Sequence, residues 1–337
     1  MPTDMCGNRN VRRTTPVRHE MPSARRRRFG SSGTRWSVAG ATTLVVAVCL
    51  VLTSCVSSKH SSAPTSPSPA PSPSMRHTTV AAPPPATTTA PASPAAGAGT
   101  PLAAEFAKLE NKLNAKMGVA ISAVGANPKQ LVFGEWASGP AWSTMKVPLT
   151  ITAMRDENPP TVTDSMRAAI TESDNAAAES IWEGLGDPVK AAHKIEAVLG
   201  KYGDPTIVEW QRRRPPFTAF GQTIWSLTNQ ARFTAAAVCD SDNAPIFTLM
   251  GQVENDQGWG LGIIPDTRFK GGWGPSPTNN YLVRQLGVLK TPTGLTAVTV
   301  ATEPASGAFN DGTQELTEVA KWLNSHMTEL PAGQCDH

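Results

Sequence analysis

The clearest apolar periodicity in the chain begins after residue 101. Leu102, Phe106, Leu109 and Leu113 recur at helical spacing, which predicts an amphipathic helix. Segments 117–124 and 130–136 have the composition of two strands, with turn-forming residues between them. Further helices are predicted over 143–155, 163–185, 188–199, 226–238 and 314–327, and further strands over 267–273, 281–290 and 295–302.

This order predicts one α/β domain over residues 102–330, followed by a short C-terminal tail over 331–337. Three late strands can pair with two early ones in a five-stranded antiparallel sheet. The terminal helices would then flank the sheet, and the helical insert would form a second lobe. A cleft between the sheet and the lobe is where we expect a functional site.

A different pattern marks the N-terminus. The basic residues Arg25–Arg28 and Arg35 precede an apolar run over 44–52. At roughly ten residues this run is short for a membrane span, and the pattern is that of an export signal. It ends in Leu52–Thr53–Ser54–Cys55, which resembles the bacterial lipobox, in which the signal is cut before a lipid-carrying Cys.

We therefore predict a lipoprotein signal peptide of actinobacterial type over residues 1–54 and lipidation at Cys55. The domain would be anchored to the outer face of the cell membrane. The alternative is an uncleaved anchor with an incidental Cys. The start at Met1 or Met21, and export by the general or the twin-arginine route suggested by Arg26–Phe29, stay open.

Residues 56–101 form a low-complexity segment. They hold 11 of the 30 prolines and no Asp or Glu, and the rest is nearly all Ser, Thr and Ala. Such a stretch buries too little apolar surface to offset the entropy lost on ordering. It predicts a disordered, extended tether between membrane and domain.

Charge and composition narrow the classes of function. The net charge of +3 combines +7 over residues 1–54, from nine Arg against Asp4 and Glu20, with −4 over the rest. A nucleic-acid partner is therefore not expected once the signal is removed. The chain has no Cys/His cluster with metal-ligand spacing and no glycine-rich nucleotide-binding motif, so we expect neither metal nor cofactor. We expect a monomer.

Two cysteines lie in the predicted domain and tail. An extracytoplasmic compartment permits a Cys239–Cys335 disulfide. Two separate thiols are the alternative, because sequence does not give the geometry that a disulfide requires. Both alternatives stay open.

Ser143–Thr144–Met145–Lys146 form an S-x-x-K motif at the start of a predicted helix. Residues three apart share a face of a helix. A Ser at the helix start lies near free N–H groups and the positive end of the helix dipole. A Lys enclosed one turn later can lose its proton and act as base for the Ser hydroxyl. The motif indicates a nucleophile with its base.

Two more segments carry candidate chemistry. Ser173–Asp174–Asn175 falls inside the predicted helix 163–185, where the Ser can pass a proton and the Asn can bind an amide. The triplet recurs at 241–243 in a predicted plain loop, so we assign function to the first copy only. Lys270–Gly271–Gly272 lies on a predicted strand before Trp273, where glycine indicates close approach of a ligand and Lys270 can bind a carboxylate.

The order and setting of these motifs are similar to those of the penicillin-recognising serine enzymes, in particular class A β-lactamases. S-x-x-K opens a helix after two strands, S-D-N follows in a helical lobe, and K-G-G lies on a strand with two strands after it. The resemblance covers residues 102–330. It implies the β-lactamase/transpeptidase-like fold, with a shortened all-helical lobe.

The resemblance also implies catalytic roles. Ser143 would be the acylated nucleophile and Lys146 its general base, directly or through water. Ser173 would deliver a proton to the departing nitrogen. Lys270 would bind the substrate carboxylate and tune Ser173.

Substrate-binding roles follow in the same way. Asn175 would hold a substrate amide, and Gly271, Gly272 and Trp273 would line the strand side of the site. The backbone N–H groups of Ser143 and Trp273 would form the oxyanion hole.

The chain departs from the family in ways that bear on deacylation. Gly271 stands where the family has a hydroxyl residue, and the spacing from S-x-x-K to S-D-N is shorter than in class A. The family's E-x-x-L-N motif, whose Glu activates the deacylating water, is missing. Glu209 is a candidate for that role, although Arg213 replaces the Asn, and Gln222 is a candidate for the cleft wall.

Two functions compete on this evidence. The first is a membrane-anchored serine hydrolase that acts on a β-lactam or a cell-wall peptide amide, in the manner of a β-lactamase or a D-alanyl-D-alanine peptidase, with slow deacylation. The second is a wall-tethered protein that keeps the fold and binds a peptidoglycan-derived ligand without catalysis. The intact motif residues favour the first function, whereas Gly271 and the missing Glu motif favour the second.

Overall fold

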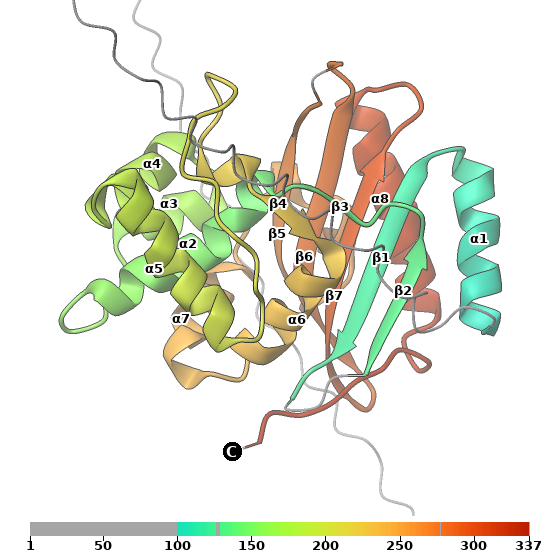
Figure 1. Ribbon diagram of the computed structural model, residues 1–337. Coiled ribbons are helices and arrows are strands. Elements are labelled where there is room, and N and C mark those ends of the chain that lie inside the picture. Colours follow the sequence, from blue (N-terminus) through green and yellow to red (C-terminus); the bar gives the residue numbers. More distant parts are fainter. Residues whose placement is uncertain (1–99, 126–128, 277, 337) are drawn as a thin grey trace, which may run out of the picture. The chain divides into compact units, whose positions relative to one another are not determined.

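The computed structural model describes residues 100–125, 129–276 and 278–336. The predicted signal peptide, Cys55 and nearly all of the predicted tether lie outside the described residues. No helix in the described part of the chain is both long and apolar enough to cross a membrane. Figure 1 shows a sheet with helices on both faces and a group of helices beside it.

The main sheet has five antiparallel strands in the order β2-β1-β7-β6-β5. This confirms the predicted pairing of two early strands with three late ones. Alternation along β1 sends Val119 and Ile121 to one face and Ala120 to the other, and all three are buried. The strands are β1 (Lys116–Ala123), β2 (Gln130–Gly134), β5 (Arg268–Pro275), β6 (Tyr281–Thr291) and β7 (Gly294–Glu303).

The terminal helices α1 (Pro101–Leu113) and α8 (Phe309–Ser325) cover one face of this sheet. The α8 residues Leu316, Val319 and Leu323 are buried against the sheet, and each contributes about 1.5–3 kcal/mol by leaving water. Phe106 of α1 meets the Trp322 ring edge-on at 5.2 Å between centroids. This layer is the one that the sequence predicted.

The other face carries α6 (Leu227–Ala237) and, beside it, a helical lobe. At its centre is α2 (Lys146–Asp156), which is buried continuously from Lys146 to Met154. A helix enclosed on all sides needs neighbours all round; these are α3 (Asp164–Thr171), α4 (Asn175–Gly184), α5 (Pro188–Lys201) and α7 (Ala244–Leu249).

A two-stranded sheet, absent from the sequence prediction, joins the lobe to the rest. Strand β3 (Ser138–Pro140) pairs with β4 (Ile224–Ser226) in antiparallel register. Three-residue strands are too short to give a readable alternation. The pairing fixes the segment that leads into Ser143.

The predicted helix 163–185 is wrong as a single element, because the structure has two helices there. Ser173 adopts a left-handed backbone with φ of 61°, which a continuing helix excludes. Asp174 then caps the next helix by accepting a hydrogen bond from the backbone N–H of Ala177 at 2.6 Å. The S-D-N triplet is therefore the joint between α3 and α4.

The second triplet is not the plain loop that we predicted. It forms a short 3₁₀ helix, η3 (Ser241–Asn243), and Asn243 is fully buried. The Asn243 amide donates to the Tyr202 hydroxyl and to the Ala237 carbonyl, each at 2.8 Å. A polar side chain with these partners ties together the ends of α5 and α6.

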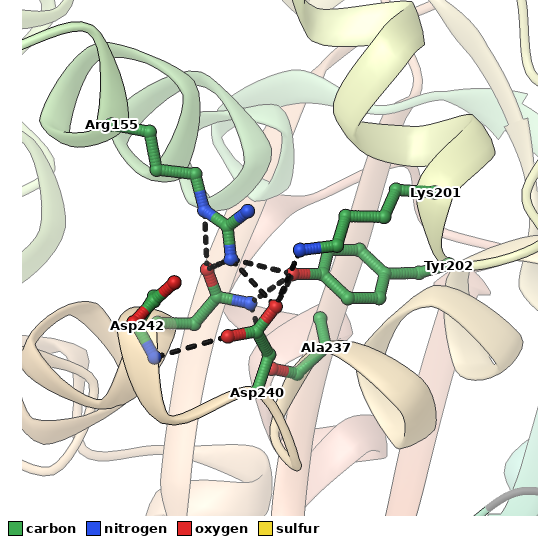
Figure 2. A network of polar contacts seen from close by, with 7 residues as sticks. Arg155, Lys201, Tyr202, Ala237, Asp240 and Asp242 are labelled. Atoms are coloured by element: carbon green, nitrogen blue, oxygen red, sulfur yellow. Dashed lines mark hydrogen bonds and ion pairs between the residues drawn. The ribbon is translucent and has the colours of Figure 1, made fainter.

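Figure 2 shows the polar network around this triplet, with Asp240 at its centre. The Asp240 carboxylate accepts hydrogen bonds from Arg155 at 2.8 Å, and from Lys201 and Tyr202 at 2.7 Å each. Burial opposes ionisation of Asp240, but these donors outweigh it and hold the pKa of the carboxyl well below its usual range. The network fastens α2, α5 and η3 to one another.

The C-terminal segment is fixed beside this network. Gly333 pairs with Leu295 of β7 through two backbone hydrogen bonds, at 2.8 and 3.0 Å. Cys335 forms a disulfide with Cys239, which stands 96 residues earlier. Closing a loop of that length stabilises a fold by about 4–5 kcal/mol in the chain-entropy treatment.

We expect Asp240→Asn to lower the free energy of unfolding at pH 7 by about 2 kcal/mol, because three donors lose a charged acceptor. A carboxyl with a depressed pKa stabilises the fold above its unfolded pKa of about 3.9 and stops doing so as pH falls. The deficit should therefore narrow below about pH 4. Urea unfolding between pH 3 and 8 measures this.

The matched control is Asp242→Asn, which removes an exposed charge two residues away. It should change the free energy of unfolding by less than about 0.5 kcal/mol. Equal effects of the two substitutions, or an Asp240→Asn deficit that does not depend on pH, would contradict the role of the network.

Candidate active site

Ser143 lies in a 3₁₀ turn, η1 (Trp142–Met145), between β3 and the first residue of α2. The sequence predicted one helix from Ser143 onward, but regular α-helix begins at Lys146. This start leaves Pro148 in the first turn, where a missing N–H is tolerated. The Ser143 side chain is half-buried, and the residues on either side of it are buried.

Backbone strain is concentrated at this site. Five non-glycine residues of the described chain have left-handed φ, and three of them are Asn or Asp, which tolerate it. The other two are Trp142, with φ of 49°, and Ser173, with φ of 61°. Such positions cost of order 1–3 kcal/mol and persist where the surroundings impose them, most often at functional sites.

Strand β5 brings its free edge against the Ser143 turn. It is an edge strand, so one side pairs with β6 and the other faces η1. A Cβ placed on Gly272 would lie 2.9 Å from the Ser143 backbone nitrogen, a clash that only glycine avoids. A Cβ on Gly274 would lie 2.5 Å from the Trp142 ring. The two glycines let strand β5 pack closely against the turn that carries Trp142 and Ser143.

Lys146 is fully buried below Ser143. Its Nζ donates to the Ser173 carbonyl and, at 2.8 Å, to Asn175 Oδ1, and it lies 3.4 Å from Ser173 Oγ. Burial lowers the pKa of Lys146 to about 7, and the negative charges of Asp174 and Glu179 only partly oppose this. A substantial share of the Lys146 side chains is therefore neutral near pH 7 and able to accept a proton.

Lys270, from β5, is fully buried as well. Its Nζ donates to Ser173 Oγ at 2.8 Å and to the Gly271 carbonyl at 2.9 Å. Burial, reinforced by the nearby Lys146, lowers the pKa of Lys270 well below its ordinary value. The Ser173 hydroxyl thus lies between two lysines, and Lys270 is placed to tune it rather than to meet a ligand at the surface.

Neither lysine has an ion-pair partner among the described residues. A buried ammonium without a carboxylate is expensive, so both amines are pushed toward the neutral state. Ser143, Lys146, Ser173 and Lys270 come from three separate parts of the fold, namely η1 with α2, the α3–α4 joint and β5. The predicted motif residues are brought together around Ser173.

The Ser143 hydroxyl is the exception. In the part of the chain that the structure describes, Oγ makes no hydrogen bond to Lys146 or Ser173. The Lys146 amine is occupied by Ser173 and Asn175 instead. Hydrogen bonds of catalytic groups are often long before substrate binds and shorten only in the complex.

Ser143 opens into a cavity of about 430 Å³ between the sheet and the lobe. Asn175, Glu179 and Arg212 line one side, and Trp273 and Gly274 the other. The aromatic wall is completed by Trp142, Phe217 and Tyr281. The cavity thus combines aromatic walls with several polar side chains, in the cleft where the sequence predicted a site.

Glu179 and Arg212 were missed at the sequence level. Glu179 lies on α4, four residues after Asn175, which puts both on one face of the helix. Arg212 donates to Glu179 Oε1 at 2.8 Å. The i, i+4 spacing of Asn175 and Glu179 was visible in the sequence, but the contact of Arg212 with Glu179 depends on the tertiary fold.

Three predicted residues have other surroundings than we expected. Glu209 pairs with Arg213 and does not line the cavity. Gln222 accepts from the Arg214 N–H and donates to the Thr218 carbonyl, so it holds its own loop. Gly271 packs against the Trp259 and Trp273 rings, and a Cβ there would lie 3.3 Å from Trp259.

A buried chain of hydrogen bonds supports the Ser143 turn from below. Thr144 Oγ1 donates to the Ala141 carbonyl at 2.5 Å and accepts from Gln230 at 2.9 Å. Gln230 Oε1 accepts from Arg284 at 2.8 Å. Arg284 is fully buried on β6, opposite Gly272. The Ser143 turn therefore rests on a fixed polar support. Over the described residues, no group of three or more His, Cys, Asp or Glu could hold a metal.

Comparison with known proteins gives structural matches only. No protein-family model and no curated protein matches the sequence. The TLA-3 extended-spectrum β-lactamase matches with a TM-score of 0.54 at 14% identity, over 67% of this chain and 98% of its own. An ancestral class A β-lactamase matches with 0.51 at 18%, over 66% and 99%. The chromosome-encoded β-lactamase of Vibrio parahaemolyticus matches with 0.51 at 12%, over 68% and 99%. These likenesses confirm the predicted fold: the chain has the architecture of the class A β-lactamases.

Proposed function

We propose that this protein is a serine acyl-enzyme that acts on a β-lactam or a cell-wall peptide amide. The observation that carries the proposal is the convergence of Lys146 and Lys270 on the hydroxyl of Ser173; both lysines are buried, and neither has an ion-pair partner among the described residues. Perturbed titratable groups gathered at a cleft are typical of active sites. The β-lactamase fold supports the same class of chemistry.

Acylation follows from these positions. Ser143 Oγ attacks the amide carbonyl carbon and gives its proton to neutral Lys146. The negative oxygen that results is stabilised by the backbone N–H groups of Ser143 and Trp273, each worth a few kcal/mol. As the C–N bond breaks, Ser173 gives its proton to the nitrogen and regains one from Lys146. Lys270, hydrogen-bonded to Ser173 Oγ, stabilises the transient negative charge there.

The cavity fits an amide of this kind. Trp142, Phe217, Trp273 and Tyr281 offer apolar walls for an acyl side chain or ring. Asn175 faces the cavity from α4 and can bind the substrate amide. The ester formed on Ser143 would be hydrolysed slowly, because the residues at Glu209–Arg213 do not supply a base to the cavity.

We extend the proposal to the location of the protein. The domain would be a lipoprotein anchored through Cys55 to the outer face of the cell membrane and held within the cell wall by the tether 56–101. The support is in the sequence: a basic and apolar signal, a lipobox-like Leu52–Cys55, and a Pro-rich segment without acidic residues.

A second function is kept because two observations favour it. The Ser143 hydroxyl has no hydrogen bond to its expected base in the described structure, and Gly271 lacks the hydroxyl of the family. A protein with this geometry that binds a peptidoglycan-derived ligand without catalysis would keep the cavity and lose the acyl step. Covalent labelling by a penicillin separates the two functions.

We expect a penicillin to add its full mass covalently to the protein, because ring opening by Ser143 leaves no leaving group. Intact-mass spectrometry over a time course checks this. Ser143→Ala should give no adduct. Ser241→Ala, which changes an exposed Ser of the second triplet, should acylate like the parent. A parent protein that shows no adduct at any time would refute the acyl-enzyme and leave the binding function.

The acylation rate should follow the protonation of Lys146. With the pKa of Lys146 held at about 7 by burial, the neutral base is populated above pH 7. The rate constant should therefore rise from about pH 6 and level off near about pH 8. Lys146→Arg, which stays charged, should lower the rate about 10²–10⁴-fold. Stopped-flow measurement with a chromogenic cephalosporin reports the profile, and a flat curve through neutrality would exclude Lys146 as base.

We expect Cys55→Ala to move the protein from the membrane fraction to the medium and to abolish incorporation of labelled fatty acid, because the thiol that carries the lipid is gone. Cys49→Ala, within the apolar run, provides the matched control and should leave both unchanged. Cell fractionation with metabolic labelling measures the two effects. A Cys55→Ala protein that stays labelled and membrane-bound would contradict lipidation at this residue.

A further inference from the structure

An acyl-enzyme on Ser143 raises the question of what hydrolyses it. The attacking water needs a base that reaches the cavity, and Lys146 is engaged by Ser173 and Asn175. We propose that Glu179 is this base, and that it activates the water that cleaves the ester. The inference rests on the proposed acyl-enzyme function and adds a residue to it.

Position is the first support. Among the described residues that line the Ser143 cavity, Glu179 is the only carboxylate. It follows Asn175 by one helical turn on α4, and Asn175 is bound directly to Lys146. The carboxylate is therefore on the cavity side of the helix that carries the S-D-N residues.

The geometry of the carboxylate is the second support. Arg212 donates to Oε1 at 2.8 Å, and the other oxygen, Oε2, has no hydrogen-bond partner in the part of the chain that the structure describes. The Glu179 side chain is 21% exposed. One oxygen thus fixes the orientation of the group, while the second can accept a hydrogen bond from a water in the cavity.

Electrostatics agree with this assignment. Burial raises the pKa of Glu179, and Arg212 opposes the rise. Lys146 and Glu179 each affect the pKa of the other, which places them in one electrostatic environment. A carboxylate that is partly desolvated is a stronger base than one in water.

Other carboxylates near the site are otherwise engaged. Asp174 caps α4 through the Ala177 N–H. Glu209 is paired with Arg213, which helps to hold its pKa below the usual value although burial opposes this. Glu183 is exposed on α4 one turn beyond Glu179, and it does not line the cavity.

The step balances in protons. Glu179 Oε2 takes one proton from the water as its oxygen attacks the ester carbonyl carbon. The tetrahedral species collapses, the bond from carbon to Ser143 Oγ breaks, and Oγ takes the proton that Glu179 had received, relayed through water. The carboxylic acid product then ionises and releases its own proton to solvent, so that Ser143 and Glu179 return to their starting protonation states. The ion pair with Arg212 weakens the base, which fits slow turnover.

The test separates acylation from deacylation in the full chain, with a chromogenic cephalosporin and intact-mass time courses. Glu179→Gln keeps the size of the side chain and an acceptor for Arg212. We expect it to acylate within about threefold of the parent, and to deacylate about 10²–10⁴-fold more slowly, so that the adduct accumulates. Glu183→Gln, on the next turn, should match the parent in both steps.

The pH profile of deacylation distinguishes a base from a structural residue. The parent should lose deacylation at acidic pH as Glu179 is protonated. Arg212→Ala should move this loss to higher pH, because an opposing cation is gone. In Glu179→Gln the deacylation rate should not show this loss at acidic pH. Thermal melting confirms that the variants are folded.

Each outcome is decisive. A parent protein that never forms an adduct overturns the acyl-enzyme itself. An adduct that forms on the parent and is never released overturns the role of Glu179 alone. Glu179→Gln that releases its adduct like the parent, or Glu183→Gln that is equally impaired, also overturns that role.

Discussion

Two buried lysines that share one serine hydroxyl, and that have no ion-pair partner among the described residues, are the constraint on which the rest of this structure depends. Lys146 and Lys270 are both fully buried, and both approach Ser173 Oγ. A pKa of about 7 for Lys146 means that the fold disfavours its ammonium form by on the order of 5 kcal/mol. A stable protein retains such a pair only where many other contacts secure it. Function is the simplest reason to keep amines in this state.

The surrounding fold holds these groups by rigid means. Ser173 is locked in a left-handed conformation at a helix joint, Gly272 lets an edge strand touch the Ser143 turn, and Trp142 is forced into a left-handed conformation just before it. Below the turn, Thr144 is held through Gln230 by a buried Arg284. The Asp240 network ties α2 and α5 to η3, and the disulfide fastens the C-terminal segment to Cys239. These stabilising contacts outside the site offset the cost of the strained backbone at Trp142 and Ser173.

Periodicity predicted most of this scaffold, because long buried strands and amphipathic helices have clear patterns. The errors occurred where a local interaction overrides the pattern. Ser173 breaks helix 163–185 through a backbone conformation that good helix formers on both sides conceal. Asn243 is buried in a segment with the composition of a loop, since its partners come from α5 and α6. Likewise the motifs located Ser143, Lys146 and Lys270, but Arg212 reaches Glu179 only through the tertiary fold.

The cavity shows that a carboxylate facing the site can come from a helix rather than from a loop. In this chain the loop carboxylate, Glu209, is neutralised by its neighbour Arg213, and Arg212 of the same loop extends to Glu179 on α4. The helix therefore supplies the anion and the loop supplies the cation at the mouth of the site. A carboxylate on a helix packed against Lys146 is more rigidly placed than one on a loop, because the helix is part of the buried core. Burial raises the pKa of this carboxylate and Arg212 opposes the rise, so if Glu179 is the base we propose, the rate at which the ester is released would depend on that ion pair.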